Sequence, residues 1–363
     1  MLSDELLCEE LSKRARELIF HDGLVLLKLV QEIQDGFFCL SWIPFAALYC
    51  KSAKELLDLS ITNKEIEQEV NDIRNGIKIF TEKFRKSKKM ATESDLHQDR
   101  LFSRPNMFYY GRRYYNLGIY FTEDGKVIGN THLMDYYLNN KESEDLQELE
   151  KRAFYLGKGL ASEIAIILEN LNSYYRHDFN EIEINSLPKI GYIDFNTHHD
   201  VVSFNELYTK DFNLVLLHIL STVGFINNVL IPVFKKKDIW ALRILYITVH
   251  NTIQALKKNK HRILVEGMNS NELDDILNYS KKILSSSFRN CMMHYGLVDK
   301  NNCATVLKEF YSIEVPYYGL IESCFNEIGF MEYFSKLENF SRCIEKYLQS
   351  LLLIDNTDIC FEW

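Results

Sequence analysis

"FNLVLLHILSTVGFINNVLIPVF", Phe212–Phe234, is the stretch of the chain that comes closest to a membrane span. Its length matches the ~20 apolar residues that a spanning helix needs. His218, Asn227 and Asn228 lie within it, and polar side chains of this kind seldom face lipid. We therefore expect a buried core helix and a chain that does not associate with a membrane.

Helical patterns continue on the C-terminal side of this stretch. Apolar residues recur with a helical period and short polar joints separate the segments. The expected helices are Asp211–Phe234, Asp238–Lys258, Glu272–Tyr295 and Tyr318–Leu353, the last with a break near Gly329. Helices of about this length with short connections favour an up-and-down helical bundle.

The N-terminal side is also mainly helical. Glu5–Phe20 and Ser60–Phe84 carry helical apolar rhythms, whereas Phe84–Arg100 loses its apolar residues and is predicted to be an exposed loop. The whole chain holds 5 Pro and 15 Gly in 363 residues, so few residues interrupt helical hydrogen bonding.

A small β element is predicted in the middle of the chain. Arg112–Met134 holds β-rich runs on both sides of Asp124-Gly125, which is a hairpin signal. Glu181–Asn196 reads as a second pair of short strands around Pro188, and a long helix or two helices, Ser143–Arg176, separates the pairs. The predicted fold is therefore mainly α. An N-terminal region, residues 1–204, has helices and short hairpins, and a C-terminal helical bundle covers residues 205–363.

Charge and cysteine content restrict the functional classes. The net charge of −9 excludes a polycation that coats nucleic acid, although Lys and Arg outnumber Asp and Glu between residues 205 and 300. The eight cysteines form no CxxC pair and have no zinc-finger spacing to histidine. No secretion signal opens the chain, so we expect reduced thiols and a cytoplasmic protein.

"SSSFRNCMMHYGL", Ser285–Leu297, collects three polar residues at the end of a predicted helix. Gly296 is expected to terminate that helix, which places His294 in its last turn, where the helix dipole favours the protonated imidazole. Asn290 and His294 are four residues apart and share a face, so the Asn290 amide could orient the imidazole. Arg289 and His294 lie about 140° apart around the axis, and a second copy of the chain could bring such a pair onto one phosphate.

The Arg–His spacing alone decides nothing, because it recurs elsewhere. It also joins Arg14 and Arg16 to His21, and Arg243 to His250. Only Arg289 is followed by a neutral polar residue at the end of a helix in the basic region. Taken alone, the residues favour capping and packing roles for Arg289 and His294 over catalysis.

"FRNCMMHYGL" resembles the signature of HEPN domains: Arg, a polar residue, and then His near a helix end. The resemblance covers this motif and the helical order of residues 205–353. It implies a helical bundle that commonly dimerises and a metal-independent ribonuclease of toxin, abortive-infection or CRISPR-associated systems. It assigns Arg289 to phosphate binding, His294 to acid–base catalysis and Asn290 to orientation. It implies RNA as the substrate, no cofactor, and a homodimer or higher homo-oligomer.

Weaker candidates lie on the preceding helix. Arg243, His250, Lys257 and Lys258 could bind substrate, or the first two could be bundle or groove residues. His198-His199 with Asp194 and Asp200 could suggest a metal site, but a turn after a strand explains them as well, and no metal is expected. Residues 1–204 could sense or restrain the bundle, and an inhibitor or sensor protein could bind it. The alternative function is a non-catalytic bundle that dimerises or binds nucleotides or a partner.

Overall fold

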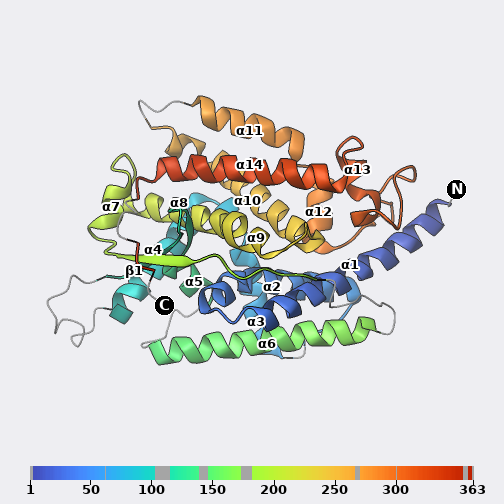
Figure 1. Cartoon of the computed structure of the whole chain (residues 1–363), viewed down its shortest axis with the longest axis horizontal. Coiled ribbons are helices and arrows are strands. Elements are labelled where there is room, and N and C mark those ends of the chain that lie inside the picture. Colours follow the sequence, from blue (N-terminus) through green and yellow to red (C-terminus); the bar gives the residue numbers. More distant parts are fainter. Residues whose placement is uncertain are drawn as a thin grey trace.

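The computed structural model describes residues 3–61, 63–102, 115–138, 146–172, 182–265, 270–299, 301–354 and 359–361. The fold is mainly α with a small three-stranded antiparallel sheet, which confirms the predicted fold class (Figure 1). The strand starts predicted at Arg112 and Glu181, and the helix limits predicted at Ser143 and Arg176, lie outside the described residues.

Capping side chains begin the N-terminal helices. Ser3 accepts a hydrogen bond from the Leu6 amide, Asp35 from the Phe38 amide and Asn63 from the Glu65 amide, so each satisfies a free helix N–H group. The elements are α1 (Asp4–Glu32), α2 (Gly36–Leu57), α3 (Lys64–Gly76), the 3-10 turn η1 (Ile79–Thr81) and α4 (Phe84–Phe102).

The predicted loop at Phe84–Arg100 is wrong, because α4 covers it. The helix buries a face that is largely polar, and hydrogen bonds join Ser87, Asp95 and His97 on that face to neighbouring groups. Its buried residues are Ser87, Met90, Ala91, Ser94, Asp95, His97, Gln98 and Leu101. A search for apolar periodicity misses a helix of this kind, since hydroxyl, carboxylate and imidazole groups stand where apolar residues are expected.

The sheet has the order β2-β1-β3. β1 (Leu117–Thr122) and β2 (Val127–Asn130) form the predicted hairpin, with Gly125 at a positive φ of 76° in the turn. β3 (Ile190–Phe195) pairs antiparallel with β1, with Leu117 opposite Phe195. The second predicted strand pair is reduced to β3, and Ile184 forms only an isolated bridge with Phe234.

Three further helices connect these parts. α5 (Thr131–Tyr137) follows β2, and α7 (Asp200–Phe204) follows β3. α6 (Leu146–Asn172) is one continuous helix that packs along α1, α2 and α3 at the edge of the molecule (Figure 1).

The C-terminal bundle contains the predicted core helix. Its elements are α8 (Lys210–Phe225), the π-helical turn η4 (Ile226–Leu230), α9 (Ile231–Val233), α10 (Ile239–Ile263), α11 (Asn271–Ile283), α12 (Ser286–His294), η5 (Pro316–Gly319), α13 (Leu320–Cys324) and α14 (Phe330–Leu351). Gly329 precedes α14, which confirms the predicted break. Lys210–Val233 is apolar enough to cross a membrane, but 83% of its apolar window is buried inside the chain, as in a core helix of a water-soluble protein.

One hydrophobic core runs through both predicted regions. β2 lies against α8 so closely that a Cβ on Gly224 would meet the Val127 carbonyl. Ser52 on α2 donates a hydrogen bond of 2.7 Å to the Met293 carbonyl on α12. The packing therefore continues across the predicted boundary between residues 204 and 205, independently of the function of either region.

Candidate functional site

The helix that carries the Arg–Asn–His motif is shorter than predicted. The segment Glu272–Tyr295 is not one helix, because α11 ends at Ile283 and α12 begins again at Ser286. Tyr246 on α10 holds the break: its hydroxyl donates to the Ser285 carbonyl at 2.7 Å and accepts from the Ser285 amide at 3.1 Å. α12 is therefore a separate nine-residue element whose N-cap is Ser285.

The end of α12 also differs from the prediction. Tyr295, and not Gly296, adopts the left-handed conformation, with φ of 63°. Tyr295 is buried, and its hydroxyl donates to Asp22 at 2.7 Å. This buried hydrogen bond compensates for a backbone conformation that non-glycine residues seldom adopt.

α12 is amphipathic in a way that exposes the motif. Phe288, Cys291, Met292 and Met293 are buried. Arg289 is half-buried, whereas Asn290 and His294 are exposed, and the His294 side chain keeps 44% of its surface accessible. The three motif residues therefore point away from the core.

Asn290 does not orient His294 as expected. Its side-chain oxygen accepts a hydrogen bond of 3.0 Å from the Arg289 guanidinium. The only ion-pair contact of His294 among the described residues is to Glu55 on α2, where Nδ1 lies 3.9 Å from the carboxylate. Asn290 therefore orients Arg289, the residue beside it.

Arg243 is a buried brace beneath α12, so the predicted substrate-binding role is wrong for it. It is 2% exposed and donates to the Cys291 and Met292 carbonyls at 3.2 and 2.8 Å. Its Nε donates to Asp22 at 2.7 Å. A buried arginine in this position satisfies carbonyl groups in the last turn of α12 and cannot meet a substrate.

The Arg243–Asp22 pair belongs to a larger buried network. The Arg243 guanidinium lies 3.8 Å from the centre of the Tyr295 ring. His21 contacts Asp22 at 3.2 Å and Asp238 at 3.3 Å. Burial opposes protonation of His21, but Asp238 and Asp22 outweigh it and raise its pKa to about 10. The network joins α1, α10 and the residue that follows α12.

Cations from two other elements surround the motif. We define the cationic patch as Arg74, Lys78, Lys257 and Arg289 together with His250 and His294. All six side chains are exposed or half-buried. The positive charges of the patch act on one another's pKa values. Arg74 and Arg289 lower the pKa of Lys78, and the same two residues together with Lys78 lower that of His294. Arg289 and Lys257 lower the pKa of His250.

The patch alters the protonation of His294. Partial burial and then the positive charges of Arg74 and Lys78 lower the pKa of His294, with a smaller contribution from Arg289. Glu55 acts in the opposite direction. The net shift is downward and favours the neutral imidazole, in the direction opposite to the expected effect of the helix dipole.

The other predicted substrate ligands divide into two kinds. His250 is half-buried beside Tyr246, and Lys257 is exposed within the patch. Lys258 donates a hydrogen bond to the Thr81 carbonyl, so it fastens α10 to η1. None of these three residues is buried, but the Lys258 ammonium group already has a protein partner, so only His250 and Lys257 are counted in the patch.

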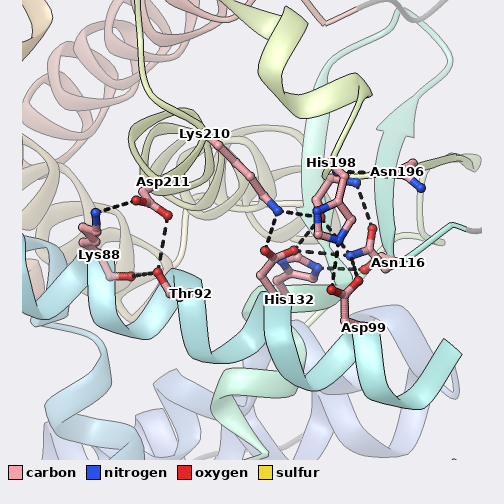
Figure 2. Close-up of polar contacts among 11 residues, drawn as sticks. Lys88, Thr92, Asp99, Asn116, His132, Asn196, His198, Lys210 and Asp211 are labelled. Carbon is pink, nitrogen blue, oxygen red and sulfur yellow. Dashed lines mark hydrogen bonds and ion pairs between the residues drawn. The ribbon is translucent and has the colours of Figure 1, made fainter. Parts of the chain in front are cut away.

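His198 belongs to a hydrogen-bond network on another part of the molecule (Figure 2). Its Nε2 lies 2.9 Å from Asp99, and Asn116 donates to Asp99 at 2.6 Å and to Thr197 at 2.8 Å. Lys210 pairs with Asp95 at 2.6 Å. The network ties α4, β1, the turn after β3 and α8 together, which favours the structural interpretation of this segment.

No group of three or more His, Cys, Asp or Glu side chains is placed to hold a metal ion within the part of the chain that the structure describes. Metal independence stays a prediction. The sequence did not reveal that Arg74, Lys78 and Glu55 adjoin the motif, because nothing in the local pattern of α2 or α3 connects them to α12.

Comparisons with known proteins give no independent support for the resemblance. No family model, no curated protein and no solved structure matches the chain.

Proposed function

We propose that the protein is a metal-independent endoribonuclease of HEPN type that acts in the cytoplasm as a defence effector or toxin. The observation that carries the proposal is the outward position of Arg289 and His294 in the cationic patch, while the remainder of α12 is buried. A polyanion would be attracted to this patch, although the net charge of the chain is −9.

The residue types suit cleavage by the 2′-hydroxyl of RNA. Neutral His294 accepts the 2′-OH proton, and the resulting oxygen attacks the adjacent phosphorus. Arg289 donates hydrogen bonds to the phosphate oxygens and stabilises the extra negative charge of the transition state. The bond to the 5′-oxygen then breaks, that oxygen takes a proton from an imidazolium or from water, and the products carry a 2′,3′-cyclic phosphate and a 5′-OH.

The lowered pKa of His294 supports the role of a base. An imidazole is an effective base only where it is unprotonated, and the charges of Arg74 and Lys78 favour that form. The hydrogen bond from Arg289 to Asn290 fixes one edge of the guanidinium and leaves other N–H groups for a phosphate.

The test is cleavage of total RNA in EDTA by the wild-type chain, His294→Ala and Arg289→Ala. Each substitution should reduce cleavage by ~10²-fold or more. Because both side chains project from the surface, each should cost less than about 1–2 kcal/mol of stability. His199→Ala is a matched control, since His199 is exposed and lies outside the patch. Unchanged activity per folded molecule in His294→Ala would refute the proposal.

The second candidate is a bundle that binds nucleotides or a partner without cleaving RNA. The cationic patch favours it equally, because a patch of this kind binds phosphate whether or not chemistry follows. Binding of RNA by wild type with no cleavage, in the same assay, would select this candidate. A sensing role for residues 1–204 and an inhibitor protein stay proposals under either function.

A further inference from the structure

The two cations of the patch that come from the N-terminal half lie near the end of α3. Arg74 is in the last turn of α3 and Lys78 follows two residues after its end. Both are half-buried, and the Arg74 Nε is enclosed without a hydrogen-bond partner among the described residues. A guanidinium carries further N–H groups beside Nε, so the half-buried Arg74 side chain can still donate to an anion.

Three cations of the patch lack the ion pairs that other surface cations form. Lysines on exposed helices commonly pair with a glutamate one turn away, as Lys28 does with Glu32 and Lys336 with Glu332. Arg74, Lys78 and Lys257 form no such ion pair with the described residues. Glu55 and Glu82 act on Lys78 in the opposite direction to Arg74 and Arg289, and a bound anion would further offset the repulsion among these cations.

Packing between the two halves holds the patch together. Asn251 on α10 donates to the Ile77 carbonyl at 3.3 Å, directly beside Lys78. Lys258 bonds to Thr81, and Ser52 bonds to Met293 next to His294. These contacts connect α10, the segment after α3, α2 and α12, so the cations stand on fixed elements. Mutual repulsion among them is visible at Lys78, whose pKa is lowered by burial and then by Arg74 and Arg289.

We propose that Arg74, Lys78 and Lys257 form a phosphate-binding subsite for single-stranded RNA next to Arg289 and His294. The inference rests on the proposed function for the identity of the ligand. The strand would place one phosphate at Arg289 and His294 and neighbouring phosphates at the subsite. The N-terminal half then contributes directly to substrate binding, and a polynucleotide is bound more tightly than a dinucleotide.

The experiment measures binding of a fluorescein-labelled 2′-O-methyl oligouridylate of about eight nucleotides, a length within the usual range of single-strand sites. This probe has no free 2′-OH, so the full chain with His294 intact can be used. Fluorescence anisotropy is recorded over a series of salt concentrations for wild type and for the double variant Arg74→Gln/Lys78→Gln. Cleavage of unmodified RNA is measured separately on the same proteins.

The double variant should bind at least about tenfold more weakly, the scale of losing charge-assisted contacts to phosphate. Its slope of log affinity against log salt should be smaller by about 1.4, because each phosphate contact to a single strand contributes about 0.7. The matched control is Lys281→Gln/Lys282→Gln. It removes the same charge from α11, on the opposite side of the molecule from α3 (Figure 1), and it should bind as wild type does.

Charge-preserving and single variants separate folding from binding. Arg74→Lys/Lys78→Arg should retain most of the affinity. If Arg74→Gln does not fold, Lys78→Gln and Lys257→Gln carry the test, and each should reduce the salt slope by about 0.7. Binding by the double variant equal to that of wild type or the control overturns the subsite, as does wild type that does not bind the probe.

The result also separates this inference from the proposed function. RNA cleavage by wild type together with unimpaired binding by the double variant overturns the subsite and leaves the ribonuclease intact. Patch-dependent binding without cleavage supports the subsite and overturns catalysis.

Discussion

The protonation of His294 depends on residues that are far from it in the sequence. Its pKa is lowered by burial and then by Arg74 and Lys78. A base with a lowered pKa stays neutral to a lower pH, so the acid limb of the activity profile should lie below the ordinary range of histidine.

Lys78→Gln should therefore move this acid limb. Removal of one positive charge favours the imidazolium, raises the pKa of His294 and shifts the limb of kcat/KM to higher pH. Lys281→Gln, on α11, should leave the limb in place. The measurement is the initial rate of RNA cleavage at low substrate concentration over a pH series. An acid limb that does not move in Lys78→Gln would show that another group titrates there.

Two buried histidines make the stability of the fold depend on pH, separately from the pH dependence of activity. Neither ring nitrogen of His218 has a hydrogen-bond partner among the described residues, and His132 keeps only the bond from Nε2 to the Asn116 carbonyl. The two rings lie 6.2 Å apart. Burial lowers the pKa of both, and for His218 the lowering is large.

His218→Leu should reduce the acid sensitivity of the fold. A folded pKa below the unfolded value of about 6.5 means that the unfolded chain binds the proton first as pH falls. Stability is then full above about pH 6.5 and decreases below it, by at most about 1.4 kcal/mol per pH unit for each such histidine. Urea unfolding at about pH 7.5 and 5.5 measures this difference. A difference that is equal in wild type and variant would contradict the assignment.

At the scale of elements, α12 depends on side chains beneath it. Arg243 and Ser52 bond to three successive carbonyls of its last turn, those of Cys291, Met292 and Met293. Asp22 connects Arg243 to Tyr295. A nine-residue helix is marginal by itself, so these contacts determine its orientation and that of the motif.

Arg243→Met should destabilise the protein by up to about 3–5 kcal/mol, because the buried Asp22 carboxylate then keeps only His21 as an ion-pair partner. Tyr295→Phe removes one hydrogen bond to Asp22 and should cost about 1–2 kcal/mol. The double variant Asp22→Leu/Arg243→Met should cost less than the sum of the single changes, since no uncompensated charge remains. Urea unfolding of the three variants measures how much the contacts of Arg243 with Asp22 contribute to stability. An Arg243→Met variant as stable as wild type would show that it contributes little.

The elements also show what the sequence could and could not predict. Apolar periodicity predicted α8, α10 and the break before α14, because these helices bury apolar faces. It missed α4, whose buried face is held by hydrogen bonds, and the break before α12, which the Tyr246 hydroxyl stabilises from another helix. The local sequence singled out Arg289 and His294 as candidate site residues, but the positions of the cations around them depend on tertiary packing.

At the scale of the molecule, the predicted regions share one core. α1 and α2 supply Asp22 and Ser52 to the support of α12, and residues at the end of α3 supply cations beside it. Residues 1–204 are therefore part of the scaffold that holds the candidate site. Regulation by this region would have to act within the packed molecule, because removing the region also removes that support.

The candidate site is incomplete within one copy of α12. Arg289 and His294 are five positions apart on α12, which separates them by about 140° around the helix axis. A two-fold partner could place its own His294 opposite Arg289, so we expect a homodimer in which each site combines residues of both copies. Sedimentation at micromolar concentration should show a dimer.

A mixing experiment tests whether such sites are shared. Arg289→Ala and His294→Ala chains, each inactive alone, are unfolded, mixed in equal amounts and refolded together. Random pairing makes half of the dimers mixed. A mixed dimer has one site with both residues intact and one with neither, so activity should return to roughly a quarter of the wild-type value. Sites confined to one chain would give no recovery, and a monomer that cleaves RNA would exclude the shared site, because no second copy would then supply the histidine.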